Sequence, residues 1–429
     1  MQDIKSPHLA QRMLAATRQA LRRGVVDLAT ASGIVLALGF VQNIFLARAL
    51  GPDGLGHLSV VNTVLNLGSL AATAGITTAV LRYSAAERDP AAAWTVYRRG
   101  IGLTTGVGLA VVATLSLWSR TPLWAFDPVA GLWLPLAALT LPLRSAASCA
   151  TEFAQSRERT RTKATLDVTA KALMVLGIVL GGLARGFPGA IVGLVVGTTL
   201  GSLVSLTFVR RLRPERTAEA SVSAGEMLRF GLWGLSTNLL ATIVSTADVL
   251  VLSALLDQPS LVGYYSIAVV LQQLGRVPLL AYLDARFPEM ARTAKVPDDL
   301  AALWRRMRRH LLLFAVPNCA AAALVAPWIV PWVFGAEYEA SVRPLQILLL
   351  RDIAFATAAA QGRALLAAGN VQANFRSAAL MAVTSVSLNL LLIPWLGLVG
   401  SAIASVASQV LWAIATLAQG RSFEASQRR

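Results

Sequence analysis

Apolar stretches of about twenty residues recur along the chain from position 25 to position 418, and each ends at a short polar or basic segment. A helix needs ~20 apolar residues to cross the ~30 Å hydrocarbon layer of a bilayer. The pattern therefore predicts twelve membrane-spanning helices. They cover about residues 25–50, 57–82, 100–119, 129–151, 165–185, 187–208, 228–255, 262–283, 310–333, 344–367, 375–394 and 397–418.

The composition agrees with a protein that is surrounded by lipid. Of the 429 residues, 55% are hydrophobic and only 14% are charged, and the mean hydropathy is +0.61. Soluble domains carry about 25% charged residues. These values exclude a soluble enzyme, a disordered chain and a β-barrel. We expect an all-α polytopic membrane protein.

The net charge of +16 is high enough to suggest nucleic-acid binding. The alternative is the positive-inside rule, by which Lys and Arg gather in cytoplasmic loops. With both termini in the cytoplasm, the predicted inner segments hold 28 of the 38 Lys and Arg residues, whereas the outer side holds four, at positions 48, 120, 185 and 343. The charge therefore indicates orientation. We expect a multi-pass protein of the cytoplasmic membrane, with both termini cytoplasmic and with no nucleic-acid partner.

The segment before the first span is basic, and two interpretations of it stay open. Residues 9–23 place small and apolar side chains on one helical face and most of their arginines elsewhere, as in a helix on the inner leaflet. A frayed basic tail is the alternative. No cleavable signal peptide is evident here. The two cysteines and three histidines are too scattered to predict a disulfide or a metal site.

Two pairs of segments show that the chain contains an internal repeat. Within the similar segments 49–68 and 254–275, residues 56–59 align with 263–266 at an offset of 207, and residues 186–197 align with 397–408 at an offset of 211. The repeat predicts two pseudo-symmetric six-helix bundles around a central cleft. The expected parts are a basic N-terminal segment (1–24), an N-terminal bundle (25–208), a cytoplasmic linker (209–227), a C-terminal bundle (228–418) and a cytoplasmic tail (419–429).

The sequence contains no phosphate-binding loop of the ATPase type and no recognisable nucleophile–base set. The glycine-rich stretch 51–56 lies between two spans, so it is expected to form a tight outer turn. We therefore expect a transporter rather than an enzyme, and no cofactor.

Ionisable residues inside the spans are costly in hydrocarbon and usually face a cavity or a partner. Asp248 lies well inside the seventh span, after a run of hydroxyl and amide side chains. One interpretation is that Asp248 takes up a proton or Na⁺ that couples transport. The other is a structural hydrogen bond or a salt bridge, for example to Arg276 or Arg351.

Basic residues near the inner ends of the spans suggest a cationic lining that would attract a diphosphate. The candidates are Arg276, Arg144, Lys171 and Arg82. Reaching out to the inner headgroups is the alternative, and it is favoured for Lys171 and Arg82. Arg351 and Asp352 are candidates for a gate, and their adjacent positions on a helix need not bring them together. Amides that place polarity in the cleft or hold helices together are Asn43, Asn62, Asn238 and Gln272.

Several segments carry a resemblance to one family. They are LARALGPDGLGHLSV (46–60), AGITTAVLRYSA (74–85), ADVLVLSALL around Asp248 with VGYYSIA (262–268), RFPEMAR (286–292), ALLAAGNVQA (364–373) and NLLLIPWLGLVGSAIAS (389–405). In order and spacing they resemble the Wzx-type polysaccharide and O-antigen flippases, within the superfamily of multidrug, oligosaccharidyl-lipid and polysaccharide exporters. His57 stands where relatives have an aromatic residue.

The resemblance implies a twelve-helix bundle that works by alternating access. It implies an undecaprenyl-pyrophosphate-linked glycan as substrate, held by a cationic cavity while the lipid tail stays among membrane lipids. It also implies coupling to H⁺ or Na⁺ in some members, an acidic position at Asp248, and a polysaccharide polymerase or co-polymerase as a possible partner. The alternative is an ion-coupled multidrug or cation exporter of the same superfamily, which a cationic inner half disfavours.

Overall fold

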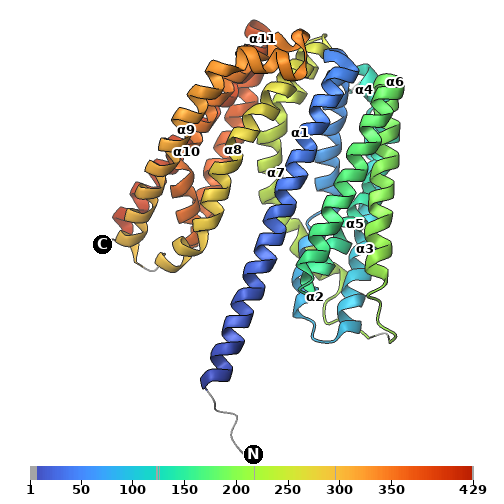
Figure 1. Ribbon diagram of the computed structural model, residues 1–429, viewed down its shortest axis with the longest axis vertical. Coiled ribbons are helices and arrows are strands. Elements are labelled where there is room, and N and C mark those ends of the chain that lie inside the picture. The colour runs from blue at the N-terminus through green and yellow to red at the C-terminus, as the bar shows by residue number, and fades with distance from the viewer. Residues whose placement is uncertain (1–6, 122–123, 125, 217, 295, 428–429) are drawn as a thin grey trace, which may run out of the picture. The chain divides into compact units, whose positions relative to one another are not determined.

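The computed structural model describes residues 7–121, 124, 126–216, 218–294 and 296–427 (Figure 1). The described side chains leave out 7–29, 233–234, 236–238, 241, 297, 371 and 423–427. Within the described residues every regular element is a helix. The helices are α1 (Pro7–Thr73), α2 (Ile76–Ala86), α3 (Pro90–Trp118), α4 (Pro128–Ala138), α5 (Thr140–Ser156), α6 (Thr160–Arg210), α7 (Ala224–Leu255), α8 (Pro259–Thr293), α9 (Pro297–Phe334), the 3₁₀ turn η1 (Ala336–Ser341), α10 (Val342–Ala367) and α11 (Val371–Gln427).

The three longest helices each contain a break where two predicted spans meet. The helices α1, α6 and α11 have 67, 51 and 57 residues, far more than the ~20 residues that cross a bilayer. Their breaks lie at Gly51 (φ 64°), Gly186 (φ 62°) and Gly397 (φ 54°). Glycine adopts these left-handed angles without a steric penalty. The breaks therefore agree with the predicted outer turns at 51–56, 186 and 395–396.

Two of these breaks repeat each other. Gly186 and Gly397 are separated by 211 positions, the offset of the second sequence repeat, and their ψ angles are −145° and −128°. Past Gly186 the helix α6 folds back, so that Gly181 packs against Gly189 and Gly177 against Gly193 (Figure 1). Glycines allow two backbones to approach this closely. The repeat thus extends from sequence to backbone conformation.

Two predicted spans are broken at positions that were not predicted. The span 129–151 bends by 49° between α4 and α5. Pro142 cannot donate a hydrogen bond to the preceding turn, and the Thr140 hydroxyl donates to the Ala137 carbonyl at 2.7 Å. The span 57–82 is interrupted after Thr73, where Gly75 (φ 67°) lies against Gly231.

By length and composition, six described helices can cross a membrane, or seven if α4 and α5 form one bent span. The protein is therefore an all-α, multi-pass membrane protein. The helices α1, α6 and α11 each run through a break, and the value of twelve crossings stays a prediction. The prediction of a surface helix at 9–23 depends on its side chains, and these lie outside the described set.

The chain forms two compact units that do not follow its order. The first comprises Met1–Gln42, Gly68–Ser116 and Pro135–Leu235, and the second comprises Asn43–Leu67, Leu117–Leu134 and Ser236–Arg429. The core of the first unit contains the ring cluster of Trp94, Tyr97 and Phe153. The core of the second packs α8, α9 and α10 around Trp304 and Met307. The predicted bundle division at 209–227 stays a prediction.

Candidate functional site

The first unit contains a cavity of about 620 Å³ lined by Ala31, Ser32, Val35 and Leu36 of α1 and by three further helical faces. Arg144, Ser148 and Thr151 lie three to four residues apart on α5, so they share one face. Lys163, Asp167, Lys171 and Met174 form a second face on the first half of α6, and Thr198, Ser202 and Ser205 form a third on its second half. The fold-back of α6 at Gly186 brings these last two faces together. The cavity combines cations with a row of hydroxyl groups.

The charges of this cavity do not cancel. Three cations, Arg144, Lys163 and Lys171, stand against two carboxylates, and both carboxylates lie by Lys163, whose Nζ is 2.5 Å from Glu152 and 3.9 Å from Asp167. Lys171 Nζ instead donates to the amide oxygen of Gln42 at 3.2 Å. Among the described residues, no carboxylate forms an ion pair with Arg144 or Lys171. The structure thus brings these two predicted cations together and leaves them available to an anionic ligand.

The other two predicted cations lie elsewhere. Arg82 is exposed on α2, and its guanidinium carbon lies 4.6 Å from the ring centre of Phe230. This is a cation–π contact within the first unit. Arg276 lies in the second unit, and its Nε donates to Asp352 at 2.7 Å. Neither residue lines the 620 Å³ cavity.

Arg276 and Asp352 form part of a buried polar cluster. The Gln272 amide donates to Asp352 Oδ1 at 2.6 Å, and the Arg276 guanidinium lies 4.9 Å from the Phe355 ring centre. Arg351 is buried beside them, and Asp352 pairs with Arg276 rather than with Arg351. Three buried atoms, Arg276 Nη2, Arg351 Nε and Asp352 Oδ2, have no hydrogen-bond partner among the described residues. Two cations thus surround one carboxylate.

Asp248 is the centre of a second buried network in the second unit, and it is 4% exposed. Tyr265 and Asn389 donate to its two oxygens, each at 2.8 Å, and the Ser405 hydroxyl donates as well. Ser401 in turn donates to the Asn389 amide oxygen at 2.9 Å. All of these donors are neutral. Within the described part of the chain, neither Arg276 nor Arg351 forms an ion pair with Asp248, so the salt-bridge alternative lacks its partner.

The partners of the predicted residues in both sites were not predicted from the sequence. Around Asp248 they are Tyr265, Asn389, Ser401 and Ser405; in the cavity they are Lys163, Asp167 and the hydroxyl groups. A signal exists for Ser401, Ser405 and Ser408, because their spacing puts them on one helical face. Asn43 and Asn62 are half-buried and line neither site, and the side chain of Asn238 lies outside the described set.

The fold and the two sites define an all-α, multi-pass membrane protein. Several solved structures share this fold. A structure of a multidrug resistance MATE transporter in an inward-facing conformation matches with a TM-score of 0.73 at 16% identity, covering 94% of this chain and 99% of that chain. The inward closed structure of the lipid II flippase MurJ matches with a TM-score of 0.71 at 12% identity, covering 92% and 87%.

A transporter from Pyrococcus furiosus, described as having a binding pocket of reversed polarity, matches with a TM-score of 0.62 at 14% identity, covering 95% of this chain and 96% of that one. Curated protein sequences give no match. A family profile described as polysaccharide biosynthesis protein matches residues 45–343. The chain belongs to this family, and the resemblance predicted from its sequence is confirmed.

Proposed function

We propose that this protein flips an undecaprenyl-pyrophosphate-linked oligosaccharide from the inner to the outer leaflet of the cytoplasmic membrane by alternating access. The product serves the synthesis of a surface polysaccharide, such as an O-antigen, a capsule or an exopolysaccharide. Membership of the polysaccharide biosynthesis family supports the process. The observation that carries the substrate is the pair of unbalanced cations, Arg144 and Lys171, beside the hydroxyl-rich walls of the 620 Å³ cavity.

The chemistry of the cavity fits the junction between a diphosphate and a sugar. Arg144 can donate a forked pair of hydrogen bonds to phosphate oxygens, and Lys171 adds a point charge. Serine and threonine hydroxyls can exchange hydrogen bonds with sugar hydroxyls. The same charges disfavour the alternative function, the export of cationic drugs, because a cationic ligand would be repelled from this cavity.

Ion coupling at Asp248 completes the proposal. A buried carboxylate is costly unless a charge of opposite sign accompanies it. The neutral donors Tyr265, Asn389 and Ser405 satisfy its hydrogen bonds but not its charge. A proton or a Na⁺ ion would supply the missing charge, so binding and release of that ion would change the energy of the second unit.

The test uses the purified protein in liposomes that carry the lipid-linked oligosaccharide. A glycosidase added outside measures how fast the glycan reaches the outer leaflet. The double variant R144A/K171A should flip at least about tenfold more slowly, because hydrogen bonds to charged groups contribute ~1.5–3 kcal/mol each. The matched control is R185A/R343A, which removes two exposed arginines outside the cavity.

Equal rates for R144A/K171A and the unmodified protein would remove the cavity from the proposal. In cells, deletion of the protein should leave lipid-linked repeat units facing the cytoplasm and abolish one surface polymer. A deletion that leaves every surface glycan intact but sensitises cells to cationic dyes would instead establish the exporter alternative.

A further inference from the structure

Two helix starts cross backbone to backbone in the second unit. A Cβ atom placed on Gly56 would overlap the carbonyl of Pro259, and one placed on Gly263 would overlap the carbonyl of Pro52. The two contacts are reciprocal, and each pair of equivalent positions is separated by 207, the offset of the first sequence repeat. The first repeat therefore meets its own copy at this point, across a local pseudo-two-fold axis.

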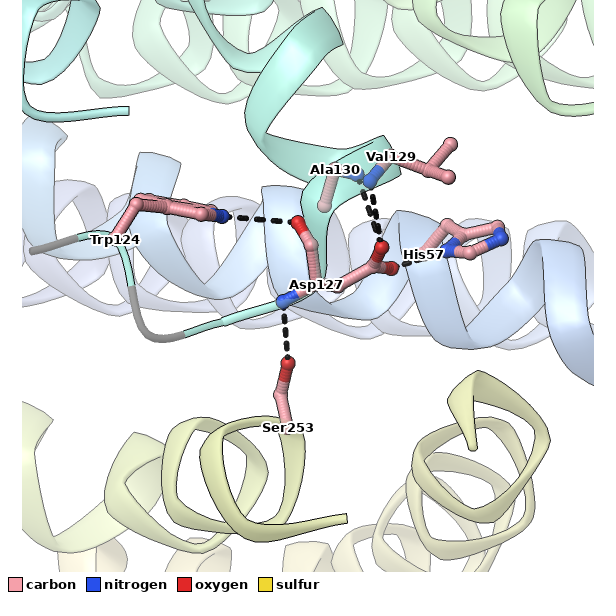
Figure 2. A network of polar contacts seen from close by, with 6 residues as sticks. All are labelled: His57, Trp124, Asp127, Val129, Ala130 and Ser253. Carbon is pink, nitrogen blue, oxygen red and sulfur yellow. Dashed lines mark hydrogen bonds and ion pairs between the residues drawn. The ribbon is translucent and has the colours of Figure 1, made fainter. Parts of the chain in front are cut away.

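A polar network adjoins this crossing (Figure 2). Asp127 caps the start of α4, because its Oδ1 accepts the backbone N–H groups of Val129 and Ala130 at 2.8 and 3.3 Å. Its Oδ2 pairs with Nδ1 of His57, and its own backbone N–H donates to the Ser253 hydroxyl at 3.2 Å. One residue thus joins α1 and α4 to the end of α7.

Arg48 makes a third contact between the two sequence halves. Its Nε and Nη2 donate to the carbonyls of Val333 and Trp332 at 2.9 and 2.8 Å. These carbonyls belong to the last turn of α9, where helix carbonyls lack partners and a cation is favourable. Nearby, the Tyr338 hydroxyl donates to the Ala47 carbonyl at 3.0 Å.

These contacts share two properties. Apart from the pair of Asp127 with His57 and the cap of α4, each joins a segment from the first six predicted spans to a segment from the last six, although all of them lie inside the second unit. Each also lies in or beside a predicted outer turn, at 51–56, 120–128, 256–261 or 334–343. We call the group of Arg48, Gly56, Asp127, Ser253 and Gly263 the outer junction.

We propose that the outer junction is the outer gate of the transport cycle, and that it must open each time the substrate leaves toward the outer side. The proposal rests on the proposed function only for the identity of the cargo. Alternating access requires the outer ends of the two sequence halves to separate. The outer junction is suited to this because its polar contacts are few and those of Arg48 are exposed, and because Gly56 and Gly263 present backbone without interlocking side chains.

The first experiment locks the outer junction with a disulfide. The variant D127C/S253C is made in a background that lacks Cys149 and Cys319 and is first shown to flip substrate. Oxidation should reduce flipping to less than a tenth, and dithiothreitol should restore it. The matched control S84C/A93C joins two neighbouring segments of the first unit, where the Ser84 hydroxyl donates to the Ala93 carbonyl, and its cross-link should leave flipping unchanged. The proposal would be overturned if cross-linked D127C/S253C flipped substrate as fast as the same variant does after treatment with dithiothreitol.

The second experiment needs no substrate, so it separates failure of the outer junction from failure of the proposed function. Spin labels at Arg120 and Asp257, exposed residues from the two sequence halves, report the width of the outer side. R48A removes two hydrogen bonds to carbonyls, so the ratio of long to short distances should rise about tenfold. R343A, another exposed outer arginine, is the control. The proposal would be overturned, whatever the cargo is, if the labels at positions 120 and 257 gave a single short distance that is the same in R48A.

Discussion

At the scale of single residues, Asp248 shows how a carboxylate can be held without being neutralised. Tyr265, Asn389 and Ser405 come from α8 and from both halves of α11, so the carboxylate joins three helical segments. A purely structural role would need these hydrogen bonds but no ion. A coupling role needs the charge as well. Substitution by asparagine keeps the shape of the side chain and removes the charge, and its NH₂ group can donate to the Tyr265 and Ser405 hydroxyls where the carboxylate accepted from them, so it separates the two roles.

We predict that D248N inserts and folds but loses the dependence of flipping on an ion gradient, with a rate at least about tenfold lower. D248A should in addition lower the free energy of unfolding by ~1–3 kcal/mol, because buried donors lose their acceptor. Flipping rates with and without proton and Na⁺ gradients, together with thermal unfolding in detergent, measure both effects. Unchanged gradient dependence in D248N would leave Asp248 with a structural role.

Glycines at the outer junction give a second prediction at this scale. G56A and G263A should each lower the free energy of unfolding by ~1–3 kcal/mol, because the added methyl group meets a backbone carbonyl that cannot move aside. The control is G102A on α3, where a Cβ atom meets nothing within 4 Å. There the loss of glycine's backbone entropy should stabilise the protein by ~0.5–1 kcal/mol. Thermal unfolding in detergent compares the three variants.

At the scale of elements, the connection between α6 and α7 is held along the first unit. Glu87 accepts hydrogen bonds from the Ser221 backbone and hydroxyl at 2.8 and 2.5 Å, and Arg216 lies 2.9 Å from Asp89. Arg99 donates to the Val222 carbonyl at 2.5 Å. The predicted polar linker is therefore fixed to the turn between α2 and α3, and this turn supplies the acidic partners.

We predict that E87Q/D89N releases this linker. The Ala91 backbone N–H and then Arg216 lower the pKa of Asp89, so its carboxylate stabilises the turn above the ordinary aspartate pKa and loses this effect as pH falls through the lowered value. At pH 8 the contacts of Glu87 and Asp89 with the linker are intact in the unmodified protein. Trypsin should then cut after Arg216 several times faster in E87Q/D89N. E219Q, which changes another exposed linker acid, should match the unmodified protein.

How far the sequence predicts these elements depends on the range of the forces involved. Apolar length and left-handed glycine are local properties, so the spans and the breaks at Gly186 and Gly397 could be predicted. The interruption at Gly75 depends on its contact with Gly231, which is more than 150 positions away. The bend before α5 could have been expected from Pro142, but proline is also common inside membrane helices, so its presence alone does not decide the geometry.

At the scale of the whole molecule, the sequence predicted the class of protein better than its sites. Hydropathy and family resemblance reflect hundreds of residues together, and both agree with the observed helices and with the family match. The site residues depend on a few long-range contacts. Arg144 and Lys171 share a cavity, whereas Arg276 is neutralised by Asp352, and nothing in their spacing along the chain distinguishes these outcomes.

The distribution of charge also makes a prediction for the whole molecule. With 28 of 38 Lys and Arg residues on the predicted inner side, alkaline phosphatase fused after Arg120 should be active, and after Glu219 it should be inactive. Green fluorescent protein at the same two positions should give the opposite pattern. A reversed result would invert the topology. It would also place Arg144, which lies near the predicted cytoplasmic end of its span, toward the outer leaflet, where the cavity could not receive a diphosphate-linked glycan made in the cytoplasm.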